Sequence, residues 1–116
     1  MRQAGIIAAA GLYAFEHNVE RLAEDHEHAK LLEEGFSSIP GVATVNGPVE
    51  TNIVLIDVSG TGKSAGEIEA GLESRGVRMG PYNNTGSLIR ALTHLDVNRA
   101  DCERALEVFR AVVAQN

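Results

Sequence analysis

The chain has 116 residues, 44% of them hydrophobic and 22% charged, which is enough for one hydrophobic core but too little for two independent domains. Its net charge is -6 and its 10 basic residues are spread along the chain, so nucleic acid and anionic membranes are excluded as expected partners. The single cysteine, Cys102, cannot form an internal disulfide, and it fits a reducing, cytoplasmic location.

The first predicted helix runs from Arg2 to about Phe15 and has small or apolar residues on all sides. A helix that is hydrophobic all round must be buried. A domain of this length seldom encloses such a helix, so we expect a second subunit or another part of a longer protein to cover it. The segment is also shorter than the ~20 residues that span a bilayer, and no membrane anchor is expected.

The second predicted helix runs from Glu16 to Phe36. Apolar positions recur along it at spacings of three and four, at Val19, Leu22, His26, Ala29, Leu32 and Phe36. We expect His26 to be half-buried on this stripe, and His17 and His28 to lie on the solvated face. His26 and His28 are two residues apart and cannot share a helix face, so no helical metal site is predicted.

Strands and helices alternate in the rest of the chain. Residues 42–45 form a short strand candidate, and residues 51–58 (TNIVLIDV) are rich in β-branched residues, which is typical of a central strand. Ser64 and Glu67 form a capping box for a third helix that Gly76 ends. Strands are predicted at 77–79 and 88–92, joined by a turn-rich loop at 80–86, and Asn98 caps a last helix. This order predicts an α+β domain, with helices on one face of a three- to four-stranded, mainly antiparallel sheet.

Residues 59–64 (SGTGKS) lie between a strand and a helix, where a phosphate-binding loop would lie. The pattern GxxxxGK[ST] requires glycine where Asp57 stands, and a carboxylate there would repel the phosphates. Gly60, Gly62 and Gly66 approximate a dinucleotide fingerprint, but no acidic residue follows at the end of a strand about 20 positions later. We interpret the segment as a flexible connection.

Arg90 is the residue that physical reasoning singles out. Alternation along its strand puts Leu88, Arg90 and Leu92 on one face. If that face is buried, the guanidinium needs a carboxylate partner, because an unpaired buried charge costs several kcal/mol. The partner is either internal, such as Asp57 or Asp96, or a ligand, since arginine suits a two-point grip on a carboxylate. The pattern leaves both alternatives open.

Two other places gather polar groups. Thr93, His94 and Asp96 follow the strand of Arg90, at a strand end where sites often form. Arg2 stands at the head of the apolar first helix, where it either faces solvent at a domain boundary or binds an anion, which a helix N-terminus favours.

Four segments together resemble the C-terminal part of the threonine aldolases: residues 1–30 (MRQAGIIAAAGLYAFEHNVERLAEDHEHAK), TNIVLIDV, SRGVRM and IRALTHLDV. The opening MRQAG and the closing THLDV are the specific pieces. Threonine aldolases are pyridoxal 5'-phosphate (PLP) enzymes of fold type I. The resemblance implies retro-aldol cleavage of L-threonine or L-allo-threonine to glycine and acetaldehyde, in a homo-oligomer (dimer or tetramer) with active sites between subunits. The bound cofactor then takes up the electrons of the carbanion.

The resemblance also implies roles for individual residues. In the family, the Schiff-base lysine precedes MRQAG, and neither Lys30 nor Lys63 matches it, so no catalytic residue is expected in this fragment and the isolated fragment is expected to be inactive. Arg90 matches the arginine of the R-x-x-T-H-L-D-V pattern that binds the substrate α-carboxylate, and Arg2 matches the MRQAG arginine near the cofactor phosphate. Residues 1–36 would be interdomain helices, with the first helix buried, and residues 37–116 the small C-terminal α+β domain.

A second interpretation belongs to another class of protein. The chain would be a non-catalytic interaction module, in which the apolar first helix binds a partner and Arg90 closes a structural salt bridge. Within the aldolase interpretation, the loop at 80–86 departs from the shorter, more apolar connection that we expect. It would reshape the entrance near Arg90 and leaves the preference between threonine and allo-threonine open.

Overall fold

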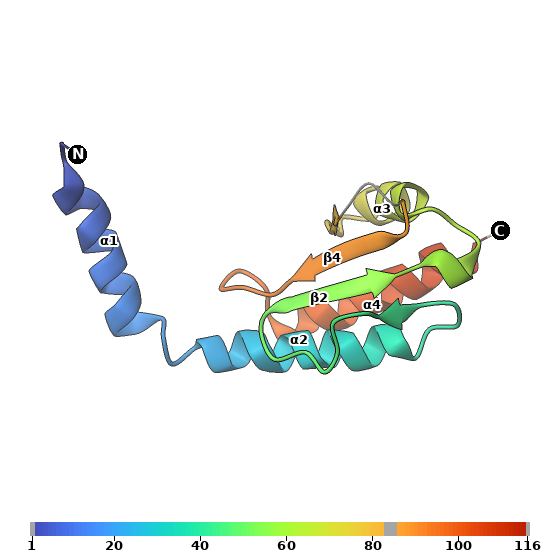
Figure 1. Cartoon of the computed structure of the whole chain (residues 1–116), viewed down its shortest axis with the longest axis horizontal. Helices are drawn as coiled ribbons and strands as arrows, with labels where there is room; N and C mark the ends of the chain where they lie inside the picture. The colour runs from blue at the N-terminus through green and yellow to red at the C-terminus, as the bar shows by residue number, and fades with distance from the viewer. Residues whose placement is uncertain (1, 83–85, 116) are drawn as a thin grey trace.

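A computed structural model describes residues 2–82 and 86–115 of the protein. In these residues the helices are α1 (Ala4–His17), α2 (Leu22–Ser37), α3 (Ala65–Glu73) and α4 (Arg99–Ala114), with a 3-10 turn η1 (Ser59–Thr61). The strands are β1 (Ala43–Thr44), β2 (Ile53–Asp57), β3 (Gly80–Pro81) and β4 (Leu88–Leu92) (Figure 1). The predicted strand at 77–79 is displaced to Gly80–Pro81, where the backbone pairs with β4.

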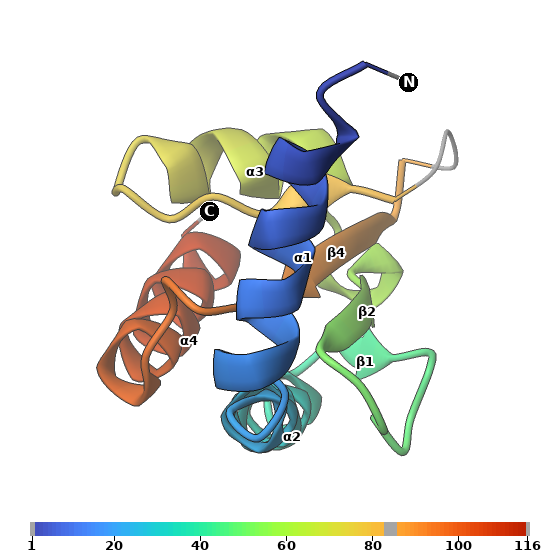
Figure 2. The same cartoon turned by 90° about the vertical axis from the view of Figure 1, so that its left-hand side faces the viewer.

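The strands form one antiparallel sheet in the order β1-β2-β4-β3. Helices α2, α3 and α4 cover one face, and Figure 2 shows the sheet with these helices on one side only. The α+β class and the antiparallel sheet agree with the prediction. The other face of the sheet is left open by the described residues, and this open face carries Arg90.

The core lies between the sheet and the helices. Alternate residues of β2 and β4 point into it, as the strand periodicity requires. The rings of Phe36 on α2 and Phe109 on α4 meet edge to face at 4.8 Å, and both side chains are fully buried. Because α2 belongs to this core, the core continues across the predicted boundary between residues 36 and 37, and the division of a longer protein into domains stays a prediction.

Both predicted helix caps are present. The Ser64 side chain accepts a hydrogen bond from the Glu67 N–H, and the Glu67 carboxylate accepts one from the Ser64 N–H. These hydrogen bonds from Ser64 lower the pKa of Glu67. Asn98 and Asp101 form the same reciprocal box at the start of α4. Local sequence therefore fixes where these two helices begin.

Helix α1 is uncovered in the described residues, and its burial by a second subunit or another part of a longer protein stays a prediction. None of its residues is buried, and Ile6 and Phe15 are 74% and 78% exposed. The helix extends away from the α/β body (Figure 1), so no layer of this chain covers it. No described helix is long and apolar enough to cross a membrane.

The break between α1 and α2 also differs from the prediction. Helix α1 ends at His17 and α2 begins at Leu22, with a turn between them. Val19 and Leu22, predicted to lie on the buried stripe, are 50% and 46% exposed. The first turn of α2 extends past the end of the sheet (Figure 1), so the buried face of α2 begins only at Asp25.

Candidate functional site

Arg90 lies in the middle of β4 on the open face of the sheet. The alternation is as predicted: Ile89 and Ala91 are buried against the helices, and Arg90 is exposed on the other side. Leu92 on the same face is 43% exposed. Arg90 needs a carboxylate partner if this face is buried. The described residues leave the face exposed, so anything that buries it would have to come from outside them.

Neither of the predicted internal partners pairs with Arg90. The Asp57 carboxylate accepts a hydrogen bond from the Ser59 N–H at 2.9 Å, which starts the turn after β2. The Asp96 carboxylate lies 3.8 Å from His94 Nδ1. Within residues 2–82 and 86–115, Arg90 forms no ion pair. Among these residues its guanidinium therefore has no carboxylate partner.

The neighbours of Arg90 across the sheet leave space beside it. Leu55 of β2 and Gly80 of β3 stand directly opposite Arg90 in the register, and directly opposite residues project to the same face. A Cβ placed on Gly80 would meet no atom within 4 Å. The arginine thus has an apolar side chain on one side and open room on the other, an arrangement that a small carboxylate can enter.

Arg2 lies apart from Arg90. It is exposed and precedes α1, where Gln3 adopts the left-handed conformation at φ 57°. The N-terminal end of α1 points away from β4 (Figure 1), so one copy of the chain does not bring the two predicted site residues together. The residues at 83–85, in the loop predicted to reshape the entrance near Arg90, and Met1 of the MRQAG motif lie outside the described residues.

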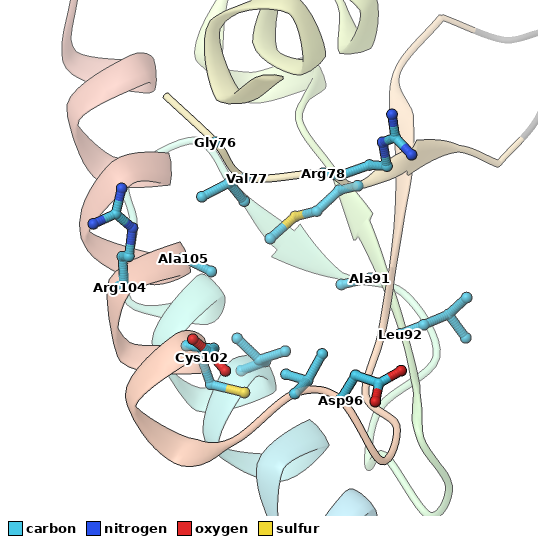
Figure 3. A pocket seen from close by; sticks show the side chains of 13 residues that line it. Gly76, Val77, Arg78, Ala91, Leu92, Asp96, Cys102, Arg104 and Ala105 are labelled. Carbon is cyan, nitrogen blue, oxygen red and sulfur yellow. The ribbon is translucent and has the colours of Figure 1, made fainter. Parts of the chain in front are cut away.

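A hollow of about 300 Å³ opens between the segment at 76–79 and the first turns of α4 (Figure 3). Its lining combines apolar residues such as Met79, Ala91 and Cys102 with four charged ones, Arg78, Asp96, Asp101 and Arg104, and Arg90 is not part of it. The thiol of Cys102 is buried, and burial together with the neighbouring carboxylates raises its pKa, which disfavours the thiolate form. The hollow lies at the end of β4, where its lining includes Leu92 as well as Ala91.

Sequence reasoning missed a polar network beside the end of β4. Arg21 grips the Asp25 carboxylate with two hydrogen bonds of 2.7 and 3.1 Å, and the bond to Asp25 raises the pKa of Arg21. The Thr93 hydroxyl donates to the Asp25 carbonyl at 2.6 Å. The spacing of Arg21 and Asp25 at i and i+4 could have indicated their pair. The link to Thr93 crosses 68 residues, and no local pattern indicates it.

The other residues considered in the sequence have local roles. His26 is half-buried, as predicted, whereas His28, predicted to be solvated, is also half-buried and its Nδ1 is buried without a partner among the described residues. His17 is exposed and bonds to the Tyr13 carbonyl. No group of three possible metal ligands lies together in the described ranges. Residues 59–64 form η1 and the cap of α3, a connection as interpreted.

Comparison with solved structures defines the class of fold. The chain superposes with a TM-score of 0.74 on a mutant of C-DES with glycine covalently linked to its PLP cofactor, at 17% identity over 97% of this chain and 29% of that one. The predicted fold, that of the smaller part of a fold-type-I PLP enzyme, is confirmed. Residues 1–61 of the 116 match the profile of the family described as beta-eliminating lyase, and the chain belongs to this family.

Curated relatives confirm the resemblance stated from the sequence. The chain is 32% identical to low-specificity L-threonine aldolase 1 of Arabidopsis thaliana over 95% of its own length. It is 33% identical to the low specificity L-threonine aldolase of Escherichia coli over 99% of its length. The chain spans 30% and 32% of these two relatives, that is, less than a third of each.

Proposed function

We propose that this chain is the C-terminal part of a PLP-dependent threonine aldolase, which cleaves L-threonine or L-allo-threonine to glycine and acetaldehyde. In this proposal Arg90 binds the α-carboxylate of the substrate and Arg2 lies near the cofactor phosphate. The observation that carries it is an exposed arginine with no carboxylate partner among the described residues, beside open room, in a chain that belongs to the beta-eliminating lyase family.

The chain does not hold a complete PLP site by itself. Lys30 is exposed on α2, and Lys63 lies in the connection before α3. Neither lysine lines any of three hollows found among the described residues. Cofactor binding is therefore assigned to the full-length enzyme, to which this chain contributes two arginines and no Schiff-base lysine.

Arg90 contributes binding and orientation. Two parallel hydrogen bonds from a guanidinium to a carboxylate fix the position of an amino acid and its rotation. Leu55, Leu88 and Leu92 surround the arginine with apolar surface, which keeps water from competing once the face is covered. In the alternative interpretation, the chain is an interaction module and Arg90 forms a structural salt bridge. The described residues provide no such salt bridge, so this part of the alternative has no support.

The first prediction concerns Arg90→Lys in the full-length enzyme. The substitution keeps the charge but removes the two-point geometry. We expect KM for L-threonine to rise about 10- to 100-fold, the range that corresponds to a charge-assisted hydrogen bond of about 1.5 to 3 kcal/mol. Steady-state kinetics with detection of acetaldehyde measures this, and glycine inhibition reports carboxylate affinity independently.

Arg78→Lys is the matched control. Arg78 is 91% exposed, and its only ion pair among the described residues is a 3.8 Å contact with Glu73. We expect this variant to keep the KM of the parent enzyme. An unchanged KM and an unchanged glycine affinity in Arg90→Lys would contradict carboxylate binding by Arg90.

The second prediction concerns the chain of 116 residues alone. Mixed with PLP and L-threonine, it should release no acetaldehyde and show no cofactor absorbance that depends on the protein fold, because it lacks the Schiff-base lysine. The measurement is absorbance spectroscopy with an acetaldehyde assay, using heat-denatured chain to correct for random lysine modification. Turnover by the purified chain would refute the assignment of the chemistry to residues outside it.

The exposed surface of α1 supports the oligomeric part of the proposal. Large apolar side chains are exposed along this helix: Ile6, Ile7, Leu12, Tyr13 and Phe15. Such a surface is unfavourable in water and marks an interface. We therefore include a homo-oligomer in the proposal, with α1 covered in the assembled enzyme. A cytoplasmic location belongs to the same proposal, since the single cysteine fits a reducing compartment.

A further inference from the structure

Thr93 uses every hydrogen-bonding group it has. It lies three residues after Arg90 and is fully buried. Its N–H donates to the Asn52 carbonyl at 3.0 Å, its carbonyl accepts from the Asn52 side-chain amide at 2.8 Å, and its hydroxyl donates to the Asp25 carbonyl at 2.6 Å. The end of β4 is thereby held both to the start of β2 and to the first turns of α2.

Asp25 carries the same connection further. Its side chain is only 5% exposed, and its carboxylate is held by Arg21, the last residue before α2. The side chain of Asp25 therefore contacts the turn between α1 and α2, and its backbone carbonyl contacts the end of β4. Arg21, Asp25 and Thr93 form a continuous path of contacts from that turn to the strand of Arg90.

Thr93 lies only three residues along the chain from Arg90, so the contacts that hold Thr93 also restrict where Arg90 lies. Three residues of β-strand span about 10 Å, so the hydrogen bonds of Thr93 fix the backbone close to Arg90. A bidentate grip on a carboxylate loses strength when its donors shift by a fraction of an ångström. The end of β4 is also the place where the strand leaves the sheet, so its position depends on the hydrogen bonds of Thr93.

We propose that Asp25 and Thr93 are positioning residues for carboxylate binding, and that their hydrogen bond holds β4 so that Arg90 meets the substrate in a fixed place. This inference rests on the proposed role of Arg90. It adds to that role a link between the α1–α2 turn and the substrate site. Neither residue contacts the substrate.

The test compares Thr93→Val with Thr93→Ser. Valine keeps the shape of the side chain and removes the hydroxyl, whereas serine keeps the hydroxyl and removes the methyl group. In the full-length enzyme, we expect Thr93→Val to raise KM for L-threonine about fivefold, the factor that corresponds to one neutral hydrogen bond, with a smaller change in kcat. Thr93→Ser should have the same KM as the parent enzyme. A packing role would give the opposite order, and this result would overturn the inference.

A measurement on the chain itself separates this inference from the function. In nitrogen-15 NMR spectra of the 116-residue chain, Thr93→Val should shift the Arg90 backbone amide resonance, and Thr93→Ser should leave it in place. An unmoved Arg90 resonance in Thr93→Val overturns the coupling whatever Arg90 binds. If instead Arg90→Lys leaves KM unchanged while the resonance moves, the proposed function fails and the structural coupling stands.

Arg21→Lys provides a second probe should Thr93→Val not fold. Lysine keeps the charge beside Asp25 but cannot make two parallel hydrogen bonds. We expect the Arg90 amide resonance to shift and KM to rise, both by less than in Thr93→Val. A variant that folds like the parent and changes neither quantity would argue against the path from the α1–α2 turn.

Discussion

Phe109→Ala should lower the free energy of unfolding by about 3 to 5 kcal/mol, the usual cost of removing a fully buried phenyl ring. Phe109 is 0% exposed and its ring packs on Phe36, which comes from α2. The substitution thus opens a cavity where α2 and α4 meet above the sheet. Since small domains are stable by about 5 to 15 kcal/mol, much of the total stability would be lost. Urea denaturation followed by circular dichroism measures the change.

Phe15→Ala is the matched control for this prediction. Phe15 is 78% exposed on α1, so the same truncation removes almost no buried surface from the chain. We expect its free energy of unfolding to stay within about 0.5 kcal/mol of the parent. Equal losses in the two variants would show that the core described between α2 and α4 is not the one that stabilises the chain.

Gly41→Ala should be the second most damaging substitution, for two separate reasons. Gly41 has φ +80°, where a residue with a Cβ is strained by about 1 to 2 kcal/mol. A Cβ there would also lie 2.6 Å from the carbonyl carbon of Gly60, so backbone must move, at a cost of about 1 to 3 kcal/mol. We expect a total loss of about 2 to 5 kcal/mol of unfolding free energy, measured by denaturation.

Gly62→Ala separates the two contributions. Gly62 has φ +77°, almost the same backbone conformation, but a Cβ there meets no atom within 4 Å. This variant should lose only the conformational part, about 1 to 2 kcal/mol. The difference between the two variants then measures the cost of separating the Gly41 turn from η1. If both variants lost the same amount, the close approach of Gly41 and Gly60 would carry no energetic weight.

The elements of the α/β body could be predicted because their signals are local. The β-branched run before Val58 and the capping boxes at Ser64 and Asn98 depend on neighbours a few residues away, and the structure contains all three. The stripe through Val19 and Leu22 misled the prediction. Periodicity shows that a face is apolar, but it does not show whether this chain or another part of the protein covers it.

For the candidate site around Arg90, too, only the features that depend on neighbouring residues could be predicted. Alternation correctly put Leu88, Arg90 and Leu92 on one face, but the side on which the helices pack is set by contacts far apart in the sequence. The hydrogen bond between Thr93 and Asp25 has the same origin, since it forms only after α2 has docked against the sheet. Residue types and spacing therefore indicated the face of Arg90, whose role in binding stays a prediction, and the tertiary structure showed which contacts hold the end of its strand.

Among the residues that the structure describes, the buried apolar side chains of the core all lie between Ala29 and Val112, and none belongs to α1. Folding of the α/β body therefore does not require α1 to be covered first. In the proposed enzyme, the α/β body can fold first and then associate with the other parts as a folded unit. Under the proposed function, Arg90 would then already be in place on β4 when the exposed apolar side chains of α1 bind their partner surface.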